Sequence, residues 1–168
     1  MIELGLIKLN DKVYVSDPCY EVGTWCQTLL DNVLPGNYRC FITKADLQEW
    51  GDRVSELWIT HEEYQSIPEE YIGNIGVDAG MAGIYDKEYF ETFNTDKHSN
   101  PRHGPWYDKV FTTLVMSEDI EGSVMDDKCV VSFSGIGDGS YPVYITRNEE
   151  EKIISIGIRF LEFDETSE

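Results

Sequence analysis

Short runs in which apolar and polar residues alternate dominate the chain, and they predict a protein built mainly of β-strands. The clearest run lies near the C-terminus, where Ile154, Ile156 and Ile158 alternate with small or polar residues. A period of two is typical of a strand with one buried face. Comparable runs predict strands over residues 3–9, 12–16, 38–43, 53–60, 73–78, 82–85, 128–134, 142–147 and 152–163. Residues 148–151 predict a hairpin turn between the last two strands.

Fewer segments carry a helical pattern. Thr60 opens a Thr-His-Glu-Glu capping box, which predicts a short helix that ends before the next proline. Asp86 is placed to cap a second helix over residues 87–93. A third helix is expected to begin at Pro105, because a missing N–H costs little in the first turn. The alternative there is a strand, since residues 110–116 are rich in β-branched side chains.

These patterns predict an α+β fold that is mostly β, with a compact antiparallel sheet or sandwich and two or three short helices. A chain of 168 residues suits one domain with a proper core. We therefore expect a single globular domain over residues 1–163, followed by an acidic tail over residues 164–168 that frays. Hydrophobic residues make up 41% of the chain and aromatic residues 12%, which excludes a disordered protein.

The net charge narrows the choice of partners. The chain carries 13 basic and 32 acidic side chains, which gives a formal net charge of −19. Nucleic acid and anionic lipid are poor direct partners, because binding them relies on Lys and Arg. A basic protein, a cation or a neutral ligand fits the charge better. The alternative is that the acidity serves solubility alone.

No continuous apolar segment approaches the length of a signal peptide or a membrane span. We therefore expect a soluble, cytoplasmic protein without a membrane partner.

The four cysteines are irregularly spaced and form no Cys-x-x-Cys pair, so neither a zinc site nor a disulfide framework is predicted. They are Cys19, Cys26, Cys40 and Cys129. Cys19 would need a basic partner to act as a nucleophile. The spacing supplies none, and no catalytic residue is assigned.

Two glycine-rich segments, residues 76–86 and 135–142, place aspartates among small residues. Glycine lets the backbone bend sharply and lets a ligand approach closely. The resulting candidate ligand-binding residues are Asp17, Asp78, Asp86, Asp138, Gly137 and Gly139. A carboxylate cluster could hold calcium or magnesium or serve in acid-base chemistry, so a divalent cation is the one cofactor considered, and the metal is left open. The alternatives are local: helix caps, an Asx turn before proline, and bonds to nearby amides.

Four tryptophans offer a different chemistry, because aromatic faces can stack on a flat or sugar-like ligand. Trp58 lies in an alternating run and Trp106 on a helical face, so both are expected to be packed. Trp25 and Trp50 stand beside turn residues and are the expected surface pair.

The order of the motifs along the chain resembles the DUF4241 family of bacterial and phage proteins. The matching segments are Asp17-Pro18, Leu34-Pro35-Gly36-Asn37-Tyr38, Gly76-Val77-Asp78-Ala79-Gly80 with Asp86, and Ser134 to Pro142. The resemblance implies a compact, mostly β domain of unknown function. The chain departs from the family pattern after Tyr144, where Ile-Thr-Arg follows in place of a Trp-Gly-like segment.

The leading hypothesis is a non-catalytic acidic binding protein that acts on a protein partner with a basic surface. It could be a phage-encoded inhibitor of a host enzyme, or a nucleic-acid mimic whose carboxylates replace phosphates. The expected partner-binding residues are exposed acidic side chains: Glu62, Glu63, Glu69, Glu70, Asp126, Asp127, Glu149, Glu150 and Glu151. The alternative is a small ligand- or divalent-cation-binding domain, or a hydrolase, centred on the aspartates. The oligomeric state stays open.

Overall fold

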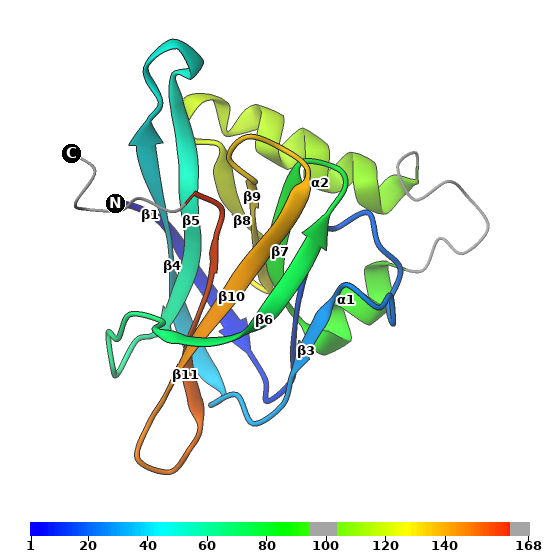
Figure 1. The fold of residues 1–168 in the computed structure, drawn as a ribbon. Helices are drawn as coiled ribbons and strands as arrows, with labels where there is room; N and C mark the ends of the chain where they lie inside the picture. Colours follow the sequence, from blue (N-terminus) through cyan, green and yellow to red (C-terminus); the bar gives the residue numbers. More distant parts are fainter. Residues whose placement is uncertain (95–103, 162–168) are drawn as a thin grey trace.

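The computed structural model describes residues 1–94 and 104–161, which form two antiparallel sheets with two helices beside one of them (Figure 1). The six-stranded sheet has the order β1 (Ile2–Leu9), β4 (Gly36–Asp46), β5 (Asp52–His61), β11 (Ile153–Arg159), β10 (Gly139–Arg147) and β6 (Glu70–Val77). The five-stranded sheet has the order β3 (Thr28–Leu30), β2 (Val13–Ser16), β7 (Met81–Asp86), β9 (Cys129–Phe133) and β8 (Gly122–Met125). The predicted α+β, mostly β class is confirmed.

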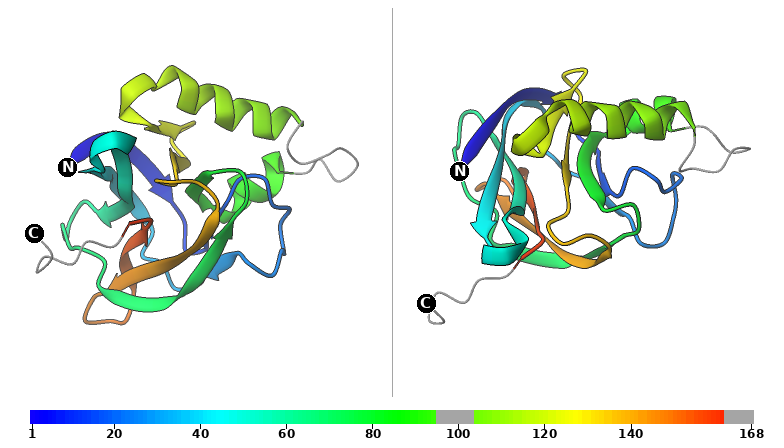
Figure 2. Two further views of the ribbon diagram at one scale, coloured as in Figure 1. Left: turned by 45° about the horizontal axis from the view of Figure 1, so that its top comes forward. Right: turned by 90° about the horizontal axis from the view of Figure 1, so that it is seen from above.

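The main core lies between the two sheets. Ile156 and Ile158 of β11 and Ile59 of β5 are at most 1% exposed and belong to it, as period-two burial requires. The sheets also approach at their edges, where Lys8 N donates to Asp127 O at 2.8 Å and Gly76 N donates to Cys26 O at 3.1 Å. The sandwich is therefore nearly closed along both sides (Figure 2).

A second core joins the helices to the outer face of the smaller sheet. The helices are α1 (Lys87–Phe93) and α2 (Pro105–Met116), and short 3-10 turns cover Gln48–Trp50 and Glu118–Ile120. Trp106, Val110 and Leu114 of α2 are buried at helical spacing against this sheet. A strand would point every second side chain outward, so the spacing of four selects the helix over the strand considered for residues 110–116.

The prediction of a helix that begins at Thr60 is wrong. Thr60 and His61 instead end β5, where they pair with Arg39 and Tyr38 of β4. The ring of His61 accepts the Glu63 N–H at 3.2 Å through Nδ1, so an amide that the capping box would have satisfied is bonded differently. Sheet pairing on both sides of β5 therefore overrides the local helix signal. The structure also contains two short strands that the pattern missed, β3 and β8.

Both faces of the last strand, β11, are buried, although the alternation of its residues predicted only one buried face. Ser155 is 0% exposed on the outer face, and a Cβ on the neighbouring Gly157 would lie 2.7 Å from Pro68 Cγ. The connection between β5 and β6 therefore crosses the outside of β11.

Neither helix in the described ranges combines the length and the apolar character that a membrane crossing requires. The expected domain end at residue 163 and the acidic tail over residues 164–168 lie outside the described residues.

The four tryptophans lie as predicted. Trp58 and Trp106 are packed, with 9% and 5% of their surface exposed, whereas Trp25 and Trp50 are 92% and 63% exposed.

Candidate functional site

Asp17 is a buried carboxylate that accepts three backbone hydrogen bonds. Its Oδ1 accepts the Cys19 N–H at 2.7 Å, and its Oδ2 accepts the N–H groups of Asp78 and Ala79, both at 2.7 Å. Burial raises the pKa of the Asp17 carboxyl above its ordinary value, and the three amides oppose that shift. Asp17 therefore ties the loop after β2 to the turn between β6 and β7.

The two glycine-aspartate turns lie side by side. Ser134 N donates to Gly80 O at 3.0 Å, and a Cβ on Gly80 would lie 4.0 Å from the Cα of Gly137. Gly137 O accepts hydrogen bonds from the hydroxyls of Ser134 and Tyr141, both at 2.7 Å. Gly80 and Gly137 have φ of 68° and 116°, which glycine adopts without strain. These contacts give both turns a structural role.

The four aspartates do not converge on one point. Asp78 and Asp138 are exposed in the paired turns, and Gly139 pairs with Val77. Asp86 lies at the other end of β7, roughly 20 Å along the strand from Asp78. Within residues 1–94 and 104–161, no three His, Cys, Asp or Glu side chains are grouped so that they could hold a metal ion.

Asp86 occupies the position before α1 but does not cap it with its side chain. Its Oδ1 instead accepts the Asn10 N–H at 2.9 Å, and the residue is 3% exposed. The backbone N–H of Lys87 donates to Lys12 O at 3.0 Å. The helix therefore begins as predicted, while the carboxylate holds the turn between β1 and β2.

The connection from β5 to β6 and the hairpin between β10 and β11 lie at one end of the sandwich (Figure 1), and both carry exposed carboxylates. The Asn148 side-chain amide lies 3.3 Å from the Tyr64 hydroxyl, and Glu69 N donates to Ile145 O at 3.2 Å. We call this surface the acidic end, and its members, all exposed, are Glu62, Glu63, Glu69, Glu70, Glu149, Glu150 and Glu151. Two segments that are far apart in sequence thus form one negative surface.

Some of the predicted partner-binding carboxylates already have partners. Glu70 forms an ion pair with Arg147 at 3.5 Å. Asp126 pairs with Lys109 and accepts the Tyr89 hydroxyl at 2.6 Å. The hydrogen bonds from Lys109 and Tyr89 lower the pKa of the Asp126 carboxyl. No such ion pair within the described ranges involves the three glutamates of the β10–β11 hairpin.

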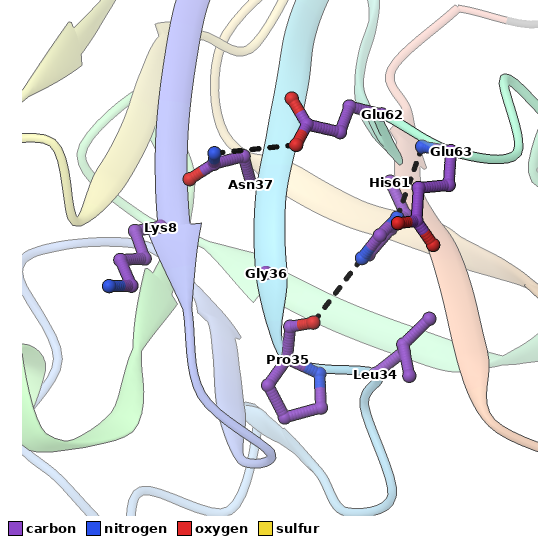
Figure 3. Close-up of a pocket in the computed structure, with 8 residues that line it drawn as sticks. All are labelled: Lys8, Leu34, Pro35, Gly36, Asn37, His61, Glu62 and Glu63. Carbon is purple, nitrogen blue, oxygen red and sulfur yellow. Dashed lines mark hydrogen bonds between the residues drawn. The ribbon is translucent and has the colours of Figure 1, made fainter.

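A shallow pocket of about 300 Å³ adjoins the acidic end (Figure 3). Lys8, Asn37 and His61 line it together with Glu62 and Glu63. The Asn37 side-chain amide donates to Glu62 Oε1 at 3.4 Å. The backbone bond from Lys8 to Asp127 places the predicted Asp126 and Asp127 next to the strand that carries Lys8.

His61 is held by both ring nitrogens. Nδ1 accepts the Glu63 N–H, so Nε2 carries the proton and donates to Pro35 O at 3.2 Å. A Cβ on Gly36 would lie 2.5 Å from Nε2, and Gly36 has a φ of 144°. His61 was not among the predicted site residues, because spacing along the chain did not place it beside Cys19, the one nucleophile considered. The Pro-Gly step at residues 35–36 was the one local signal of a close backbone approach.

The comparisons with known proteins identify one family. The model of the family described as "Protein of unknown function (DUF4241)" matches residues 10–158. No curated protein and no solved structure matches the chain. The matched range includes Asp17, both glycine-aspartate turns and the acidic end.

Proposed function

The chain belongs to the DUF4241 family, whose function is unknown, and we propose that it is a non-catalytic protein that binds a basic protein partner through the acidic end. One observation carries this proposal: seven exposed carboxylates from two distant segments gather on one surface. Gathered charge of one sign steers a partner of opposite charge and accelerates association. The overall charge of −19 adds to the attraction at long range.

The aspartate-centred alternative has less support. Three backbone amides donate hydrogen bonds to the two Asp17 oxygens, which leaves these oxygens poorly placed to bind a cation. Asp86 lies at the far end of β7. We therefore propose no hydrolase and no divalent-cation cofactor.

The carboxylates of the acidic end are suited to a flexible basic segment as well as to a folded basic surface. Glu149, Glu150 and Glu151 stand on a hairpin that projects from the sandwich (Figure 1). In the sharper form of the proposal, these carboxylates occupy a nucleic-acid-binding cleft in place of phosphates, and the partner is an enzyme that this chain inhibits. Displacement of a DNA duplex from such an enzyme distinguishes this form from simple docking.

A charge-reversal pair tests the surface directly. Glu149→Lys with Glu150→Lys alters the acidic end, and Glu49→Lys with Asp52→Lys alters the exposed β4–β5 hairpin at the opposite end by the same charge. Binding of an oligolysine peptide is measured by titration calorimetry at about 50 mM and about 300 mM salt. We expect the first variant to weaken binding about tenfold at low salt and the second about twofold.

Equal weakening by both variants would contradict the proposal, because it would show that net charge and not this surface governs binding. Binding that does not change with salt would contradict it as well, since the length over which exposed charges are screened falls from about 14 Å at 50 mM to about 6 Å at 300 mM salt. The circular dichroism spectrum of each variant serves as the folding control.

A further inference from the structure

Helix α2 carries apolar side chains on two of its faces. One row packs into the core beneath the helix. A second row, one position further along, consists of Tyr107, Phe111 and Val115 at the same spacing of four, and we call it the outer row. Phe111 and Val115 are 45% and 52% exposed, and α2 lies on the outside of the molecule (Figure 2). A surface helix with one buried face ordinarily carries polar residues on the other, so this helix is unusual.

The outer row is ordered and continues past the end of the helix. The rings of Tyr107 and Phe111 are stacked, with a centroid separation of 6.1 Å and an interplanar angle of 8°. Met116 and Ile120 follow, and they are 76% and 44% exposed. Charged residues make up 27% of the chain, yet only two of the twelve residues of α2 are charged. An exposed apolar surface of this kind marks a site of interaction.

The charged side chains at the two ends of the outer row are acidic. Asp108 lies in the first turn of α2, and Glu118 and Asp119 follow its last turn. All three are exposed, and none of the ion pairs between described residues includes them. Their charges are therefore available to a partner of opposite sign.

Two lysines near the helix already have carboxylate partners. Lys109 is the one basic residue of α2, and it pairs with Asp126. Lys44 of β4 pairs with Glu121 at 2.9 Å and also donates to the backbone oxygen of Asp119. An incoming protein therefore meets a surface that is apolar in the middle and negative at both ends.

A second copy of this chain fits the outer row poorly. If two α2 helices packed antiparallel, Asp108 of one copy would face Glu118 and Asp119 of the other. If they packed parallel, the same carboxylates would meet at each end. Both arrangements place negative charge against negative charge, and each copy carries a net charge of −19. The charge pattern therefore selects a different partner, one with basic groups at both ends.

We propose that the outer row docks an amphipathic helix of a partner protein, which carries an apolar row along its length and Lys or Arg at both ends. A ridge of side chains four positions apart packs into the grooves of another helix, and apolar anchors at helical spacing are typical of such docking. Asp108 and Glu118 are ten positions apart, roughly 15 Å along a helix. The basic groups of the docked helix are therefore about ten positions apart as well. This surface and the acidic end share no residue, so the inference does not rest on the function proposed above.

Fluorescence anisotropy with a labelled synthetic peptide tests the proposal. The peptide has about 18 residues, with leucines at positions i, i+4 and i+8 and lysines about ten positions apart on either side of them. We expect saturable binding to the wild type. Phe111→Gln should weaken it about tenfold, because this change removes the central apolar side chain of the outer row. Asp108→Asn with Glu118→Gln should weaken it about threefold, because the carboxylates are exposed and screened.

Matched controls make the same changes at other surfaces. Ile67 is 61% exposed in the β5–β6 connection, so Ile67→Gln controls for the loss of an exposed apolar side chain. Glu149→Gln with Glu150→Gln controls for the loss of two charges, at the acidic end. Both control variants should bind the peptide within about twofold of the wild type. The circular dichroism spectrum of each variant shows whether it is folded.

Four results would overturn the proposal. The first is no binding of the peptide to the wild type. The second is equal binding of a peptide in which serine replaces every leucine, because charge alone would then explain the attraction. The third is an equal loss of affinity in Phe111→Gln and Ile67→Gln. The fourth is a dimer in sedimentation equilibrium that Phe111→Gln dissociates, which would assign the outer row to a second copy. The calorimetric test of the acidic end uses oligolysine, which has no apolar side chain, so each test can fail without the other.

Discussion

Replacing Asp17 with asparagine is expected to destabilise the protein by about 1–3 kcal/mol. The carboxylate accepts from Cys19 on one oxygen and from Asp78 and Ala79 on the other. An asparagine has one oxygen and one NH₂ group, so at least one buried amide would face a donor instead of an acceptor. The variant also loses the charge that strengthens each remaining bond.

Asp17→Ala removes every acceptor and should cost more, roughly 3–5 kcal/mol, because all three amides lose their partner. Domains of this size are stable by about 5–15 kcal/mol, so the asparagine variant should still fold. Urea unfolding followed by tryptophan fluorescence measures the change, and Trp106 is a close reporter because its indole donates to Pro18 O at 2.8 Å. With a slope of about 2 kcal/mol per M, the urea midpoint should fall by about 0.5–1.5 M for Asp17→Asn and by about 1.5–2.5 M for Asp17→Ala.

Asp138→Asn is the matched control, because it makes the same chemical change on an exposed aspartate of the adjoining turn. Its free energy of unfolding should stay within about 0.5 kcal/mol of the wild type. The reasoning is refuted if Asp17→Asn is as stable as this control. It is also refuted if both variants lose the same stability, since burial and amide bonding would then not be the cause.

Three further predictions concern the fold around the site. Burial raises the pKa of the Tyr38 hydroxyl, so its contribution to stability is complete below the pKa of the unfolded state and is lost as the pH rises towards the pKa of the folded state. In urea unfolding, Tyr38→Phe should therefore lose less stability than the wild type when the pH is raised above about 10. Gly36→Ala should cost about 2 kcal/mol or more, because its Cβ would meet His61 Nε2 at 2.5 Å; an unchanged melting temperature would contradict this. Leu114→Ala should cost about 2–5 kcal/mol by thermal melting, since Leu114 is 0% exposed, whereas Val115→Ala, at 52% exposed, should have little effect.

The acidic end is formed by two segments whose proximity no local sequence pattern predicts. Each glutamate between residues 62 and 70 and between 149 and 151 was visible as an acidic side chain in a polar segment. Nothing local places these two segments together, because their contact depends on the order β5-β11-β10-β6 within the sheet. Strand order is a property of long-range pairing, which period-two alternation does not encode.

The sequence by itself determined the elements whose signals are local and strong. Alternation of Ile154, Ile156 and Ile158 specified the last strand, and Pro105 specified where α2 begins, while the choice between helix and strand over residues 110–116 needed the structure. The DUF4241 motifs were recognisable in order, and the family match confirms them. These features depend on neighbours within a few residues, so the pattern alone is sufficient.

Only the tertiary structure decided the roles of Asp17 and of Thr60 at the end of β5. Asp17 could be assigned to a metal, to catalysis or to a turn until its partners Asp78 and Ala79, some sixty positions later in the chain, were in place. Thr60 is a strand residue and not a helix cap, because pairing with strands on both sides outweighs a capping box. The physical reason is the same in each case: a polar side chain takes its role from the donors and acceptors that the fold brings to it.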